Sequence, residues 1–171
     1  MNGRTHKVGG ACAGVLAGAM LLQPPYTFDK MLLTGVLVGG SLIGSLMPDI
    51  DHKGSTIGHQ MKLTSTVISN LFGHRGMTHA PIIHILTTII LLLIGGTLTD
   101  FPKLIYVSFI IGLFIGGISH LILDSMTISG IPLLYPFSKK KYRIAKFTTG
   151  KHEVLVQIIL IITTLILINI I

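Results

Sequence analysis

The sequence has 171 residues, of which 50% are hydrophobic and only 11% are charged, and its mean hydropathy is +0.78. A chain of this length forms one domain, and this composition excludes an ordinary soluble domain and predicts a single integral membrane domain over residues 1–171. The net charge of +7 does not indicate a nucleic-acid binder, because Trp is absent and the basic residues lie beside apolar runs, where they typically anchor membrane helices. The single cysteine, Cys12, excludes an internal disulfide.

Five apolar runs come close to the length that crosses the hydrocarbon core of a bilayer, about 20 residues. A helix satisfies its own backbone in lipid, so we expect an all-α, multi-pass transmembrane helical bundle of about five spans. Glycines at helical spacing, such as Gly35, Gly39 and Gly40, are expected to let neighbouring helices approach closely. The runs are Val8–Leu22, Met31–Met47, Pro81–Leu98, Leu104–Leu123 and Val154–Ile171.

Lys and Arg are distributed unevenly among the segments outside these runs. Most of them lie before the first run, between the second and third, and between the fourth and fifth, where Lys139–Lys141 form a cluster. The other two connections hold only Lys30 and Lys103. The positive-inside rule therefore predicts that the N-terminus and the loop 48–80 lie on the cytoplasmic side of the cell (inner) membrane, with the C-terminus outside.

The loop 48–80 holds two of the six acids and four of the eight histidines of the chain. Asp and neutral His are ligands of divalent metals, so this density predicts a metal site. Asp49 and Asp51 are separated by one residue, and in an extended segment both carboxylates would point the same way and hold one metal or bridge two. The bare Asp-x-Asp pattern also occurs in helix-terminal turns, and this alternative stays open.

Apolar residues within this loop, from Leu63 to Phe72, recur with helical spacing and predict a short amphipathic helix. The helix either lies in the interface plane of the membrane, with Lys62 at the head groups, or packs on the bundle. The sequence favours neither alternative.

His120 and Asp124 lie four residues apart near the end of the fourth run, which places both side chains on one face of a helix. Such a pair chelates one ion, or the Asp orients the His by accepting a hydrogen bond from its ring. Ionisable residues near a membrane span are costly and indicate function, although groups at a helix end can reach water.

His74, Arg75 and His79 lie in the short segment Gly-His-Arg-Gly-Met-Thr-His. The planar guanidinium of Arg75 suits a phosphate or carboxylate. A solvated loop with Arg75 as a membrane anchor is the alternative. The predicted topology, which was built from the cations alone, places every candidate ligand at one membrane face: His6, Asp49, Asp51, His74, His79, His120, Asp124 and Glu153.

Three ordered blocks of residues resemble the YdjM-like family of predicted membrane-bound metal-dependent hydrolases. The blocks are Pro48–His52, Gly73–His79 and Ser119–Thr127, and the match extends from Thr5 to Glu153. The resemblance implies a multi-pass membrane hydrolase. The metal ligands that it implies are Asp49, Asp51, His79, His120 and Asp124, followed by His6, His74 and Glu153.

We therefore expect one or two divalent ions, Zn²⁺ or Mn²⁺, and hydrolysis of an ester or phosphoester in a membrane lipid or polyprenyl phosphate through metal-activated water. Glu153 or His74 would move protons, and Arg75 with the lysine cluster would hold an anionic head group. The alternative is a non-catalytic metal-binding transporter, sensor or scaffold. Transporter sites usually lie near the midplane between repeated halves, whereas these donors gather at one end, which favours the enzyme. Three histidines stay unassigned: His52, His59 and His152.

Overall fold

The computed structural model describes residues 1–72 and 76–170, and all regular secondary structure in these ranges is helical, which confirms the all-α class. Each predicted apolar run contains one long α-helix. The elements are α1 (Gly3–Leu21), α2 (Phe28–Gly44), η1 (Met47–Asp51), α3 (Thr56–Gln60), α4 (Lys62–Phe72), η2 (Met77–His79), α5 (Pro81–Ile94), η3 (Gly95–Thr97), α6 (Asp100–Ser125) and α7 (Glu153–Ile168), where η denotes a 3₁₀-helix.

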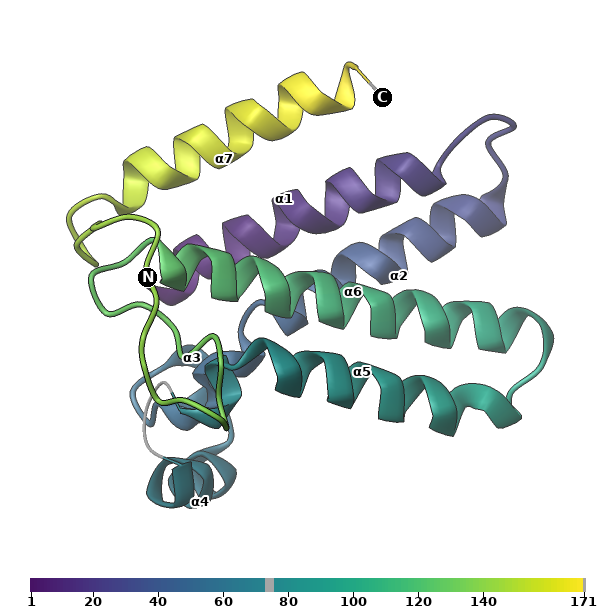
Figure 1. Ribbon diagram of the computed structural model, residues 1–171. Coiled ribbons are helices and arrows are strands. Elements are labelled where there is room, and N and C mark those ends of the chain that lie inside the picture. Colours follow the sequence, from purple (N-terminus) through teal and green to yellow (C-terminus); the bar gives the residue numbers. More distant parts are fainter. Residues whose placement is uncertain (73–75, 171) are drawn as a thin grey trace.

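The five long helices α1, α2, α5, α6 and α7 lie side by side and alternate in direction (Figure 1). The turns after α1 and α5 lie at one end of the bundle, together with the C-terminus. The N-terminus, residues 45–72 and 76–80, and the segment 126–152 lie at the other end. Every candidate ligand within the described residues therefore belongs to an element that reaches this second end.

Helix α2 packs most extensively on α6, and small residues make this possible. A Cβ atom on Gly116 would lie 2.0 Å from the carbonyl oxygen of Ser41, and one on Gly44 would lie 2.1 Å from that of Leu113. The prediction of close packing is thus confirmed for Gly40 of α2, whose Cβ would lie 2.5 Å from the Phe109 carbonyl oxygen. It is wrong for Gly35 and Gly39, which face open space.

Two helical stretches of the described chain are long and apolar enough to cross a membrane, Phe28–Asp51 and Asp100–Ser125. Pro81–Thr97 and Glu153–Ile168 are apolar but shorter. Of the five expected spans, two therefore have the length and composition needed to cross a membrane. The shorter ones nevertheless expose their apolar side chains: α5 buries none of its residues, and α7 buries only Glu153, Val156 and Thr164.

The segment 126–152, which carries the lysine cluster, is tied to the end of α6. The backbone N–H of Ile144 donates to the carbonyl of Ser125 at 2.9 Å, and that of Phe147 donates to the carbonyl of Met126 at 2.9 Å. The lysines therefore lie at the same end of the bundle as the last turn of α6.

Candidate metal centre

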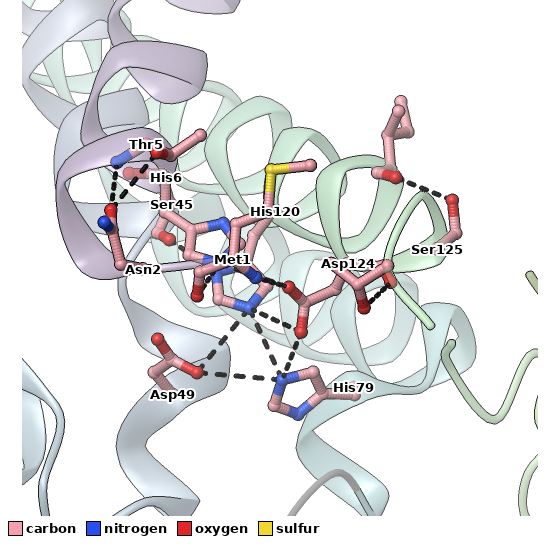
Figure 2. Close-up of polar contacts among 12 residues, drawn as sticks. Met1, Asn2, Thr5, His6, Ser45, Asp49, His79, His120, Asp124 and Ser125 are labelled. Carbon is pink, nitrogen blue, oxygen red and sulfur yellow. Dashed lines mark hydrogen bonds and ion pairs between the residues drawn. The ribbon is translucent and has the colours of Figure 1, made fainter. Parts of the chain in front are cut away.

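Four donor atoms from three separate elements converge at the polar end of the bundle (Figure 2). His79 comes from η2, Asp49 from η1, and His120 and Asp124 from the last turns of α6. The two Nε2 atoms of His79 and His120 are 3.4 Å apart. Asp49 Oδ1 lies 3.8 Å from each of these nitrogens. Asp124 Oδ2 lies 3.6 Å from the His79 nitrogen and 3.9 Å from the His120 nitrogen.

The shortest of these distances, 3.4 Å, equals the edge of a tetrahedral coordination shell, and the longest is 3.9 Å. With metal–donor bonds of about 2.1 Å, two donors at the tetrahedral angle lie about 3.4 Å apart. The donor types are also those of a borderline divalent ion, two imidazole nitrogens and two carboxylate oxygens. Both imidazoles are fully buried, as is Asp124 at 1% exposure, whereas the Asp49 side chain is 15% exposed. The cluster has the donors to hold a metal ion, with one open side at Asp49.

Local structure explains how each donor reaches this point. The i, i+4 spacing stacks His120 and Asp124 on one face of α6, as predicted. Pro48 at the start of η1 turns the chain directly after α2, which brings Asp49 back toward the end of α6. Pro81 begins α5 and leaves His79 in the short turn before it.

The far nitrogens of both histidines are held by the protein. His120 Nδ1 lies 2.7 Å from the backbone carbonyl oxygen of Ser45, which can only accept, so Nδ1 carries the proton and Nε2 presents a lone pair. His79 Nδ1 lies 3.3 Å from Asp51 Oδ2, and the Thr78 hydroxyl donates to the same oxygen. A carboxylate or carbonyl behind a ligating histidine fixes its tautomer and orientation.

Asp51 was expected to contact the metal directly, but its carboxylate lies beside the other ring nitrogen of His79. Its carboxylate lies behind His79, and it is absent from both groups of described residues whose donor atoms lie within 4.8 Å of one another. Asp49 is in one of these groups, with His79 and His120.

The second group consists of His6, His120 and Asp124. The His6 ring stacks on His120 at 3.6 Å between centroids, and its Nε2 lies 3.3 Å from Asp124 Oδ1. Met1 places its ammonium nitrogen against the same oxygen. His6 Nδ1 is buried without a hydrogen-bond partner. Asp124 therefore presents one oxygen to His6 and the other to the four-donor cluster.

Glu153 lies at a different contact, between α7 and the start of α1. Its carboxylate accepts hydrogen bonds from the Thr5 hydroxyl, from the Asn2 backbone at 3.0 Å and from the Gly150 backbone at 3.2 Å. Burial raises the pKa of the Glu153 carboxyl, but the hydrogen bonds from Thr5 and from the two backbone groups outweigh it and hold the pKa below its ordinary value. Glu153 lies just before the apolar residues of α7. Its carboxyl is ionised at neutral pH, because its pKa lies below the ordinary value of a glutamate.

The remaining candidates within the described residues are absent from both donor groups. His74 and Arg75 lie outside the described residues. His59 is exposed on α3, and His52 is exposed at the end of η1. His152 Nδ1 accepts from the Thr148 backbone at 3.2 Å.

Sequence reasoning missed two residues that shape the site, Ser45 and Thr78. Ser45 acts through its backbone carbonyl, which carries no signal in a sequence. The position of Thr78 beside His79 was the available hint that its hydroxyl reaches the site.

Comparison with known proteins identifies the family. A family model described as "YdjM inner membrane protein" matches residues 1–170. The chain is 38% identical over 136 residues to the Bacillus subtilis (strain 168) protein named "Uncharacterized protein YvsG", a match that covers 80% of this chain and 74% of that protein. It is 34% identical over 102 residues to "Inner membrane protein YdjM" of Escherichia coli (strain K12), covering 58% of this chain and 49% of that protein. The chain thus matches about half the length of the latter.

No solved structure matches the chain. The family model covers nearly every residue, and the helices α5 and α7 expose apolar side chains of the kind that lipid covers. These findings agree with the composition and with the resemblance of the three motif blocks. The protein is a membrane protein, and the chain belongs to the YdjM inner membrane protein family.

Proposed function

We propose that the protein is a membrane-embedded, metal-dependent hydrolase that cleaves an ester or phosphoester bond of a membrane lipid or polyprenyl phosphate. The observation that carries this proposal is the convergence of His79, His120, Asp49 and Asp124 from three elements at 3.4–3.9 Å. A divalent ion held there, Zn²⁺ or Mn²⁺, would supply a Lewis acid that activates water and polarises the bond to be cleaved.

The residues of the chain divide the work by position. His79, His120, Asp49 and Asp124 would hold the ion. Asp51 orients His79 from behind, so that its Nε2 faces the centre. His6, beside the other oxygen of Asp124, supplies a further donor for a site with two ions. The partly exposed Asp49 leaves the approach for water and substrate open.

Glu153 holds the start of α1 through Asn2 and Thr5, the residue directly before His6. This contact supports a positioning role for Glu153, because its carboxylate bonds to α1 and not, within the described residues, to the donor cluster.

We infer that all five long helices cross the membrane, with the metal centre and the N-terminus on the cytoplasmic side. The exposed apolar surfaces of α5 and α7 support this, since such surfaces suit lipid and not water. A span shorter than the hydrocarbon core is accommodated by local thinning of the bilayer at modest cost. The Lys and Arg excess at the end that holds the centre supports the orientation.

Metal analysis of the purified wild-type protein tests the centre. We expect about one or two Zn²⁺ or Mn²⁺ per chain, as in sites with these donors, and loss of the ion in His120→Ala. His59→Ala is the matched control, because His59 is exposed on α3 and should leave the metal content unchanged. A wild-type protein that binds no divalent metal would contradict the proposal.

Release of phosphate or fatty acid from mixed membrane lipids tests turnover. The release should depend on added metal and fall by at least about a hundredfold in Asp49→Ala, the size of effect expected when electrostatic stabilisation of a reaction is lost. Equal release by wild type and Asp49→Ala would contradict hydrolysis at the proposed metal centre. Stoichiometric metal with no release would favour the non-catalytic alternative.

A further inference from the structure

Two cavities of different character lie on either side of η1: the polar cavity is lined by polar and apolar surface in similar parts, and the groove is almost wholly apolar. One has a volume of about 350 Å³ and includes Asp49, His52, Ser55 and Asn2 in its lining. The other is an apolar groove of about 200 Å³ between η1, α5 and α6, lined by residues that include Ile50, Ile83, Leu91 and Phe114. Asp49 of the donor cluster lines the polar cavity. The groove comes near the cluster through Thr78, the residue before His79.

The 3₁₀ conformation of η1 sorts its side chains between these cavities. In a 3₁₀-helix the side chains at i and i+3 lie on the same face. Leu46, Asp49 and His52 follow this spacing, and all three line the polar cavity. Met47 and Ile50 follow it one residue later, and both line the groove. One short element therefore separates a polar compartment from an apolar one.

Several polar groups within the groove, namely His84 Nε2 and the hydroxyls of Thr78 and Thr88, already bond to the protein. His84 Nε2 lies 3.0 Å from the Thr78 carbonyl oxygen, to which it donates. The Thr88 hydroxyl donates to the His84 carbonyl at 2.7 Å. What the groove offers a ligand is consequently hydrocarbon surface. Met47, which is 40% exposed, and the exposed Thr87 lie at its outer edge.

We propose that the groove binds a hydrocarbon chain of a membrane amphiphile whose polar head group lies in the polar cavity, so that η1 separates the two parts of one molecule. An amphiphile matches a cavity with polar side chains beside an apolar groove, and the exposed apolar face of α5 puts the groove beside the lipid. This amphiphile is the substrate if the proposed function holds. The binding itself does not require turnover.

Photolabelling of the full-length protein in detergent micelles tests the groove. The probe is a monoacyl phosphocholine with a diazirine at mid-chain, and labelled residues are located by mass spectrometry. We expect labels concentrated in 83–91 and 110–114. Leu91→Trp fills the groove and should lower labelling there by about tenfold, equivalent to about 1.4 kcal/mol of binding. Ile90→Trp is the matched control, because Ile90 is its exposed neighbour and is not part of the lining.

Thr87→Trp provides a second plug at the outer edge, and circular dichroism of each variant confirms that it is helical. Equal labelling in Leu91→Trp, Thr87→Trp and Ile90→Trp, or labels spread over every exposed apolar face, would mean bulk lipid contact and would overturn the inference. Metal content measured on the same samples keeps the proposals apart: a wild type without metal contradicts the hydrolase, whereas selective groove labelling in that sample still supports the chain-binding groove.

Discussion

Asp49 and Asp51 are two residues apart, yet their carboxylates lie near different nitrogens of His79, Asp49 near Nε2 and Asp51 near Nδ1. In an extended chain their carboxylates would point the same way. Met47–Asp51 instead forms a 3₁₀-helix, in which each residue turns by about 120°, so positions i and i+2 face different directions. Asp49 consequently faces the donor cluster and the polar cavity, while Asp51 is buried behind His79. In the proposed metal centre, Asp49 would bind the ion and Asp51 would orient His79.

This division of roles makes a prediction about metal affinity. Asp51→Asn should still bind an ion, but its Kd should be raised by about 10–100-fold, the usual effect of losing the carboxylate that hydrogen-bonds a ligating histidine. Asp49→Asn should abolish stoichiometric binding. Competition titration against a chromophoric chelator measures both, with Asp29→Asn on α2 as a control that should match wild type. Equal losses in Asp49→Asn and Asp51→Asn would restore Asp51 as a direct ligand.

At the level of single residues, the sequence predicts a site only where its elements are regular. The i, i+4 pair His120 and Asp124 could be assigned to one helix face, because α6 is long and apolar. The hydrogen bond from His120 to the Ser45 carbonyl could not, since it depends on how closely α2 approaches α6. The position of Asp51 beside His79 Nδ1 could not be predicted for a related reason: a five-residue 3₁₀-helix has no periodic pattern to predict.

Among the elements, the contact between α2 and α6 determines the geometry of the centre. A Cβ atom on Gly116 would meet the Ser41 carbonyl oxygen at 2.0 Å and the Ser45 backbone nitrogen at 2.7 Å. Gly116 lies one turn before His120, and Ser45 holds that histidine. Any separation of α2 and α6 should therefore displace His120, the proposed metal ligand.

Gly116→Ala should lower the melting temperature by about 2–12 °C, because overpacking of this kind costs about 1–3 kcal/mol, and it should also reduce bound metal. Gly39→Ala is the matched control, since a Cβ there meets open space and alanine favours a helix. Circular dichroism melts of the detergent-solubilised protein measure both. Similar melting temperatures for wild type and Gly116→Ala would show that the helices separate without cost.

Helix α4 has the reverse of the burial pattern of a soluble surface helix. Leu63, Val67 and Leu71 follow one stripe at i, i+4 and i+8 and are 81%, 50% and 69% exposed, while Ser65 on the other side is fully buried. Its axis is viewed end-on in Figure 1, across the direction of the long helices. Both features favour a helix in the interface plane of the membrane over one that buries its apolar face on the bundle.

A tryptophan at Val67 tests this position of α4, because the chain contains no other tryptophan. In Val67→Trp protein reconstituted into vesicles, lipids brominated near the head-group end of the acyl chain should quench the fluorescence by about half or more if the stripe is buried about 5–10 Å into the membrane boundary. Vesicles of the same lipid without bromine are the control. Emission near that of tryptophan in water, with no quenching, would place the stripe in solvent.

For the whole molecule, the apolar runs were sufficient to predict the number and order of the long helices, because each run fills one pass through the bundle. They could not predict that α1 starts inside the site, with His6 stacked on His120. That contact joins residues more than a hundred positions apart and depends on the packing of α1 against α2 and α6 together. The alternating directions of the five helices bring every donor to one end, in agreement with the order of charged connections.

The orientation of this bundle is testable with single cysteines in a Cys12→Ala background. Lys103→Cys, at the end of the bundle opposite the metal centre, should react with a membrane-impermeant maleimide in intact cells. Lys140→Cys, in the cluster tied to the end of α6, should react only after the membrane is opened, because positively charged connections stay on the cytoplasmic side. Both residues are exposed lysines, so differences in reactivity report the side of the membrane. Labelling of both cysteines in intact cells would contradict an odd number of passes between them, and labelling of Lys140→Cys alone would reverse the bundle and place the metal centre outside.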